Sequence, residues 1–188
     1  MIGHPDDTMR SVELACNASF TDFLAREPLP WVRTRFQIST HPPQAIVGGM
    51  SLGGLAAAYA GLRYPTLFGN ILSQSGAFYW KPEQEVEYEW LTRQFVASPR
   101  LPLKRYLSVG LLETRPAMGT RPNLLIANRH LRDMSERSGN TFERRLTCKT
   151  TGKLDILMET ENKYNSGATR VSPTRHRPRW NPAYAATQ

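Results

Sequence analysis

Short apolar runs alternate along the chain with longer stretches that carry apolar side chains at helical spacing. The strands predicted are 45–49, 68–73, 105–110 and 141–146, and the helices are 52–63, 86–97 and 121–137. Strands that alternate with helices in this way favour parallel βαβ units. The pattern therefore predicts an α/β protein with a mostly parallel sheet and helices on both faces.

A helix is also expected near the start of the chain, where Asn17 or Ser19 can accept hydrogen bonds from its first turn. Its apolar face is interrupted by Pro28. A proline inside a helix costs about 3 kcal/mol. We therefore expect this helix to break or kink at Glu27–Pro28.

Beyond Leu146 the hydrophobic periodicity fades and the composition becomes basic. The last 42 residues contain seven Lys or Arg against three Asp or Glu, which is half of the net charge of +8. We expect an ordered domain over 1–146 and a disordered basic tail over 147–188. No nucleic-acid-binding motif accompanies this charge, so no nucleic-acid partner is expected. No apolar run approaches the roughly 18 residues of a membrane span, and no membrane partner is expected.

The clearest chemical motif is Gly-x-Ser-x-Gly at residues 49–53, between a predicted strand and a predicted helix. This is the pattern of a nucleophile elbow, which holds Ser51 in a strained turn. Gly49 and Gly53 would keep side chains away from the neighbouring strand and helix. The amide of Leu52 would point toward a developing oxyanion. The alternative is a glycine-rich turn whose serine only caps the helix.

Several segments of the chain, agreeing in order and spacing, resemble the enterochelin (ferric enterobactin) esterases. They are residues 10–14, 16–17, 20–25, 29–33, 48–54, 68–76, 89–92 and 127–133. The resemblance covers about residues 10–145. It implies a partial α/β-hydrolase fold and a cytoplasmic serine esterase that cleaves the ester bonds of a catecholate siderophore. Its partner would be this small-molecule ester; no cofactor or protein-bound metal is implied, because iron arrives with the substrate.

Carried over to this chain, the resemblance makes Ser51 the nucleophile and the Leu52 amide one oxyanion donor. Glu113 follows a predicted strand and lies where the acid of the triad is expected. The chain order Ser then Glu fits the α/β-hydrolase order of Ser, acid and His. The alternative for Glu113 is a surface carboxylate in a loop between a strand and a helix.

The chain departs from the family where the general base should lie. Family members carry a Gly-Gly-His-Asp-type segment after the last strand, but residues 146–152 contain no histidine. The long N-terminal portion of the family is absent too, so the chain is expected to be truncated at both ends, and a frameshift would explain the tail. His176 has the right chain order but lies among arginines and prolines. A serine without a base is a poor nucleophile, so the sequence leaves activity open.

Two other functions remain open. One is a non-catalytic binder that keeps the cleft and holds an anionic ferric catecholate with basic residues. The other is a general carboxylesterase acting on feruloyl or acetyl esters of sugars. Aromatic residues in the segment 74–80 favour an aromatic substrate if they wall a cleft, but they could equally pack beneath the loop.

Overall fold

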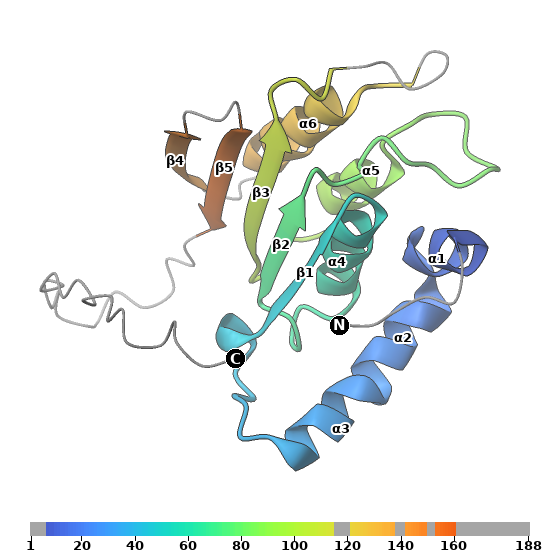
Figure 1. Cartoon of the computed structure of the whole chain (residues 1–188), viewed down its shortest axis with the longest axis vertical. Helices are drawn as coiled ribbons and strands as arrows, with labels where there is room; N and C mark the ends of the chain where they lie inside the picture. Colours follow the sequence, from blue (N-terminus) through green and yellow to red (C-terminus); the bar gives the residue numbers. More distant parts are fainter. Residues whose placement is uncertain (1–6, 115–120, 138–141, 150–152, 161–188) are drawn as a thin grey trace, which may run out of the picture.

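The computed structural model describes residues 7–114, 121–137, 142–149 and 153–160, which form a five-stranded sheet with helices packed against it (Figure 1). The helices are α1 (Asp7–Leu14), α2 (Ala18–Arg26), α3 (Pro28–Arg35), α4 (Leu52–Arg63), α5 (Trp90–Ala97) and α6 (Leu124–Arg137), with a short 3-10 turn η1 (Pro42–Gln44). The strands are β1 (Ile46–Met50), β2 (Asn70–Gln74), β3 (Lys104–Gly110), β4 (Phe142–Lys149) and β5 (Lys153–Thr160).

The N-terminal helices begin and end where local chemistry dictates. Asn17 caps α2, since its Oδ1 accepts a hydrogen bond from the Phe20 N–H at 2.9 Å. The predicted break at Glu27–Pro28 is confirmed: Glu27 ends α2, and Pro28 is the first residue of α3. A proline is tolerated at that position because its missing N–H would have no partner in the helix.

The two later helices start a few residues after the predicted positions. α5 begins at Trp90 rather than near residue 86, because Glu89 adopts a left-handed conformation with φ 62°. α6 begins at Leu124 rather than 121. There Asn123 Oδ1 accepts a hydrogen bond from the Ile126 N–H at 2.8 Å, which is the geometry of an N-cap.

The sheet has the order β1-β2-β3-β5-β4. β1, β2 and β3 are parallel, with Gly49 opposite Ser73 and Ser73 opposite Leu107. β5 pairs antiparallel with both β3 and β4. The three parallel strands carry the loops that form the candidate site, so this half of the sheet matters most for function.

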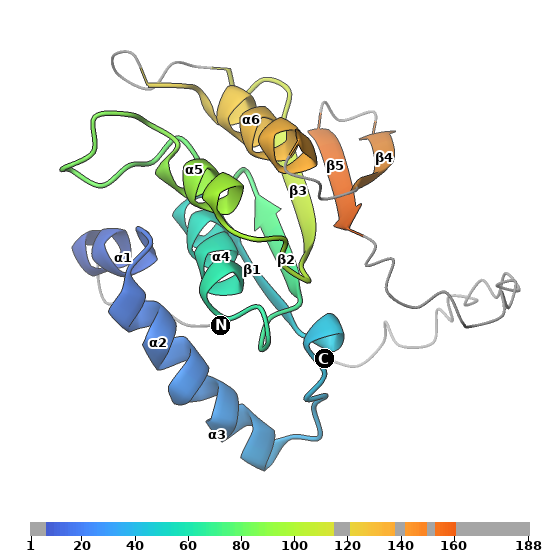
Figure 2. The ribbon, with the colours of Figure 1, turned by 180° about the vertical axis from the view of Figure 1, so that it is seen from behind.

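Helices α4, α5 and α6 cover one face of the sheet, as Figure 2 shows from behind. β1, β2 and β3 follow one another in a single direction across the sheet. Right-handed crossovers then return every helix to the same face. The core between these layers includes the fully buried Leu55, Ile71 and Leu91.

The sequence predicts helices on both faces of the sheet, but the face opposite α4, α5 and α6 differs from this prediction. No helix of the described residues lies over it, and α1–α3 lie instead beside α4 and the β1 edge (Figures 1 and 2). Ile46, Met50 and Leu72 are 66%, 64% and 41% exposed there. The alternation of strands and helices predicts the crossovers, but the strand order that decides which face they cover is a tertiary property.

The end of the sheet also differs from expectation. β4 continues to Lys149, and β5 lies within the 147–188 segment for which disorder was expected. In 153–160 Leu154, Ile156 and Met158 alternate with other residues, which suits a strand on the open edge of β3. Residues 161–188 lie outside the described ranges. None of the helices that are described has both the length and the apolar character that crossing a bilayer requires.

Candidate active site

Ser51 lies in the turn between β1 and α4, in a backbone conformation that residues other than glycine rarely adopt. Its φ is 56° and its ψ is −121°. Such a conformation costs about 1–3 kcal/mol, and it is typical of a nucleophile elbow, where a sharp turn exposes the serine hydroxyl. The Ser51 side chain makes no capping hydrogen bond to α4. The alternative of a serine that only caps the helix is therefore not observed.

The elbow is tied to the segment that follows β2. The Ser51 N–H donates to the Gln74 carbonyl at 3.0 Å, and the Ser51 carbonyl accepts from the Ala77 N–H at 3.0 Å. Gln74 ends β2, so these bonds hold Ser51 at the carboxyl end of the parallel strands. Ligands of open α/β sheets bind at that end. Within the described ranges, the Ser51 Oγ has no hydrogen-bond partner.

The glycines around Ser51 have different roles from those expected. A Cβ added to Gly49 would lie 2.4 Å from the backbone carbon and oxygen of Gly53, so Gly49 is required for the strand and helix to approach. A Cβ on Gly54 would lie 2.4 Å from the Ser73 Oγ. A Cβ on Gly53 would meet nothing within 4 Å. The close approach therefore depends on Gly49 and Gly54, and a side chain at Gly53 would not clash.

Leu52 is the first residue of α4. The N–H groups of the first helical turn have no acceptor within the helix and carry the positive end of its dipole. The Leu52 amide is thus a donor next to Ser51, as an oxyanion donor must be. Its role stays a prediction.

Glu113 is held in the turn after β3. Its Oε1 accepts two hydrogen bonds, one from the Ser75 Oγ at 2.7 Å and one from the Gly110 N–H at 3.1 Å. The Glu113 N–H also donates to the Gly110 carbonyl at 3.1 Å. Glu113 is therefore a fixed carboxylate with one oxygen engaged twice, which differs from a solvated surface carboxylate. Its catalytic role stays a prediction.

Ser75 is a site residue that the sequence analysis missed. Its φ is 46°, and its N–H donates to the carbonyl of Ser108 on β3. It lies between Gln74 and Ala77, which bond the backbone of Ser51, and its own hydroxyl bonds Glu113. Ser75 thereby links the elbow to the candidate acid. The only sequence signal for it is a serine directly after a strand at the ligand-binding end.

Two of the chain's histidines lie in the described ranges, and neither faces Ser51. His41 precedes β1, so a strand of five residues, about 16 Å long, separates it from the elbow. The Nδ1 of His130 contacts both carboxylate oxygens of Glu89, at 2.9 and 3.1 Å. His4 and His176 lie outside the described residues.

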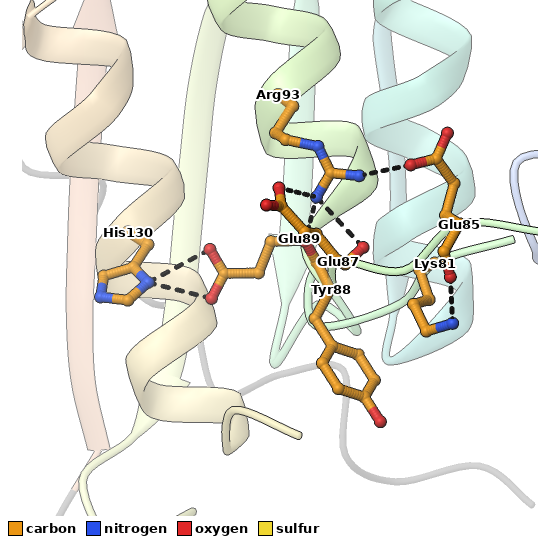
Figure 3. A network of polar contacts seen from close by, with 7 residues as sticks. All are labelled: Lys81, Glu85, Glu87, Tyr88, Glu89, Arg93 and His130. Atoms are coloured by element: carbon orange, nitrogen blue, oxygen red, sulfur yellow. Dashed lines mark hydrogen bonds and ion pairs between the residues drawn. The ribbon is translucent and has the colours of Figure 1, made fainter. Parts of the chain in front are cut away.

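Figure 3 shows that the His130–Glu89 pair belongs to a polar network at the start of α5. Arg93 of α5 donates to Glu85 Oε2 at 2.9 Å and to the carbonyl of Glu87 at 3.1 Å. It also donates to the carbonyl of Tyr88. The network fixes the segment before α5 against α5 and α6. His130 is thus engaged in packing two helices together.

The aromatic residues after β2 differ in burial and in the residues that they contact. Phe78 is fully buried in the core. Trp80 packs edge-on against Trp90 with ring centroids 6.0 Å apart. Tyr79 remains half-buried beside Arg121. Of the two alternatives, packing beneath the loop describes Phe78 and Trp80, and Tyr79 also packs against the core.

Two hollows elsewhere on the molecule do not contain the candidate residues. One of about 560 Å³ is lined by α1–α3, β1 and α4, and includes Gly49 and Gly53 but not Ser51. The other, of about 770 Å³, lies between α5 and α6 around His130. In the described part of the chain, no three His, Cys, Asp or Glu side chains lie close enough to hold a metal ion.

Known proteins with a similar sequence or fold include esterases. The iron(III) enterobactin esterase of Escherichia coli (strain K12) is 45% identical over 75 residues, which make up 40% of this chain and 19% of that protein. The enterobactin esterase of Shigella flexneri, solved in the presence of 2,3-dihydroxy-N-benzoyl-glycine, superposes with a TM-score of 0.60 at 32% identity. That match covers 71% of this chain and 34% of the other.

The ferric enterobactin esterase of Salmonella typhimurium gives a TM-score of 0.57 at 35% identity, over 71% of this chain and 33% of that one. The chain thus spans about a fifth of the curated relative and a third of the solved structures. These matches and the three parallel strands with their elbow show an α/β-hydrolase-like fold. A family model described as "Putative esterase" matches residues 8–143. Since that match covers well over half of the sequence, the chain belongs to this esterase family.

Proposed function

We propose that the chain is a serine esterase-like protein in which Ser51 is the nucleophile, Leu52 one oxyanion donor and Glu113 the acid. The observation that carries the proposal is the Ser51 backbone, at φ 56° between β1 and α4 with a hydroxyl that caps nothing. A strained serine at the carboxyl end of a parallel sheet is the arrangement that α/β-hydrolases use for ester cleavage.

The chemistry follows from these positions. The Ser51 Oγ would attack the ester carbonyl, and the Leu52 N–H would stabilise the negative charge that develops on the carbonyl oxygen. A base must take the hydroxyl proton and later return it to the leaving alcohol. Glu113 would orient such a base through the carboxylate oxygen that Ser75 and Gly110 leave unoccupied.

Neither histidine of the described residues is placed to act as the base. His41 lies at the other end of β1, and His130 is bound to Glu89. Loss of one member of a triad leaves a residual acceleration of about 10³–10⁴-fold over water, from binding and the oxyanion hole. We therefore propose that this chain binds its ester and that Ser51 attacks it slowly, with solvent water in place of a histidine taking the hydroxyl proton and supplying one to the leaving alcohol.

The proposed substrate is the ester of a catecholate siderophore, a small molecule that brings its own iron. Its support is the 45% identity to a protein named iron(III) enterobactin esterase. A structural match was solved with a dihydroxybenzoyl ligand. We propose cytoplasmic action on this small molecule, with no nucleic-acid or membrane partner and no resident cofactor.

The test is hydrolysis of a chromogenic short-chain aryl ester by the purified chain beside Ser51→Ala and His176→Ala. We expect a slow rate that Ser51→Ala lowers to the residual rate from binding and the oxyanion hole, and that His176→Ala leaves unchanged. Circular dichroism controls for folding, and Ser39→Ala, which alters an exposed loop serine, controls for loss of a hydroxyl elsewhere.

Equal rates for the folded wild type and Ser51→Ala would contradict Ser51 as a working nucleophile. If His176→Ala lowers the rate, His176 is the base. That result would contradict the proposal that turnover is slow because the site has no histidine base. Comparison of the aryl ester with a catecholate trilactone then tests the substrate class. A preference for feruloyl or acetyl sugar esters would contradict the siderophore assignment.

A further inference from the structure

Arg121 lies just before α6 and packs its guanidinium on an aromatic ring. Its guanidinium carbon lies 4.0 Å from the centroid of the Tyr79 ring, and its Nε is buried without a hydrogen-bond partner. Three other arginines pair with a carboxylate; they are Arg63, Arg93 and Arg132. Among the residues that the structure describes, no carboxylate pairs with Arg121.

The pair lies in the two loops that form the candidate site. Tyr79 comes two residues after Ala77, whose N–H donates to the Ser51 carbonyl. Arg121 leads into α6, and α6 is bound to the same loops. The Asn128 side chain donates to the Gly76 carbonyl at 2.8 Å.

A second bond fixes the start of α6 to the candidate acid, since the Leu125 N–H donates to the Glu113 carbonyl at 3.3 Å. Arg121 lies four residues before Leu125 and stacks on Tyr79, so it stands between the segment that holds Glu113 and the segment that follows Ser75. Among the described residues, the segment after β2 contacts the loop after β3 through the Ser75–Glu113 bond and the Arg121–Tyr79 stack, and contacts α6 through the Asn128–Gly76 bond.

A guanidinium stacked on an aromatic ring keeps its in-plane N–H groups free for a further partner. Those donors match two adjacent oxygens of a planar anion, which a lysine cannot do in the same way. The ring also fixes the orientation of the fork, so fewer rotamers are lost when an anion binds.

We infer that Arg121, oriented by Tyr79, binds a carboxylate of the molecule whose ester reaches Ser51. The inference rests on the proposed function for the location of the ester. It assigns Arg121 as the residue that selects anionic over neutral aryl substrates. If Arg121 only closed the loop by packing on Tyr79, the charge of a ligand would not matter.

The test is equilibrium binding of two compounds to the full chain, measured by calorimetry. The compounds are 2,3-dihydroxybenzoate and the neutral 2,3-dihydroxybenzamide. We expect the wild type to prefer the carboxylate by roughly tenfold, as a charge-assisted hydrogen-bond pair allows. Arg121→Gln should remove that preference, and Arg121→Lys should keep only part of it. Arg129→Gln, which removes an exposed α6 arginine, is the matched control and should leave the preference intact.

The inference is overturned if the wild type binds neither compound or binds both equally. An unchanged preference in Arg121→Gln, or an equal loss in Arg129→Gln, would overturn it as well. If circular dichroism shows that Arg121→Gln does not fold, Arg121→Lys alone decides the question. A lysine variant that fully keeps the preference for the carboxylate would contradict binding through the paired N–H groups of the guanidinium. The assay involves no ester, so a chain that fails to hydrolyse can still pass it. A chain that hydrolyses a neutral ester can likewise fail it.

Discussion

Backbone strain in this chain is concentrated at residues that end strands or begin helices. Of the described residues other than glycine, Cys16, Ser51, Ser75 and Glu89 have positive φ. Ser51 and Ser75 each directly follow a parallel strand, at the end where ligands bind. Such conformations persist only when surrounding contacts hold them. Here the holding contacts are the hydrogen bonds of the Ser51 backbone with Gln74 and Ala77, and the bond from Ser75 to Glu113.

Strain at Ser51 predicts the order of stability of two variants. Ser51→Ala and Ser51→Gly both remove the hydroxyl, but alanine keeps a Cβ at φ 56° and glycine does not. We expect the free energy of unfolding of Ser51→Gly to exceed that of Ser51→Ala by roughly 1 kcal/mol, measured by urea denaturation. Ser98, with an ordinary φ of −79°, is the control. There we expect Ser98→Gly to be less stable than Ser98→Ala. Equal stabilities at position 51 would contradict strain.

The two glycines of the motif predict opposite effects of the same substitution. Gly49→Ala forces a methyl group against the Gly53 backbone, and we expect a loss of about 1–3 kcal/mol. Gly53→Ala places its methyl group in open space and removes freedom from the unfolded chain, so we expect a gain of about 0.5–1 kcal/mol. Thermal unfolding of both variants measures this. A loss at both positions would show that the turn needs glycine for another reason.

At the scale of elements, the sequence predicts what local chemistry decides. Helix 52–63 is found at its predicted bounds, because a glycine-rich turn starts it and Tyr64-Pro65 stops it. The break before Pro28 is local too. The Ser75–Glu113 bond and the Arg121–Tyr79 stack join residues 38 and 42 positions apart, and no periodicity reports such contacts. Glu113 is predicted from its place after a strand, the chain order and the family resemblance, and not from its contacts.

One carboxylate of α2 bonds the end of α4 and the residue that follows it. Asp22 Oδ1 accepts hydrogen bonds from the Tyr64 hydroxyl and the Arg63 guanidinium, each at 2.7 Å. These bonds, that from Tyr64 foremost, lower the pKa of the Asp22 carboxyl below its usual value. A carboxyl whose pKa is lower in the folded state stabilises the fold above the unfolded pKa, near 3.9. That contribution is lost as the pH falls through the folded pKa.

We therefore expect Asp22→Asn to be less stable than the wild type at neutral pH, with a difference that closes as the pH falls below about 4. Urea denaturation across this range measures the difference. Tyr64→Phe removes the leading donor, so in that background the Asp22→Asn difference should shrink. A difference that does not change with pH would contradict the ion pair and hydrogen bonds as its source.

At the scale of the whole molecule, the helices that the structure describes cover one side of the sheet (Figures 1 and 2). Parallel strands are usually buried on both faces. Here Ile46 and Met50 of β1 and Leu72 of β2 share the open face, because the register sets Leu72 opposite Gly48. Among the described strands, β1 also lies at the edge of the sheet and pairs with β2 alone. An exposed apolar edge is a site of association between chains.

This open face predicts self-association that charge should suppress. Ile46→Lys with Met50→Lys places two like charges on the face without entering the core, since both side chains are more than 60% exposed. We expect the double variant to sediment as a smaller species than the wild type at the same concentration, with unchanged circular dichroism. Val86→Lys with Leu112→Lys is the matched control, because these apolar residues are 90% and 86% exposed away from the open face. Equal effects of the two pairs would show that net charge, rather than the open face of β1 and β2, governs association.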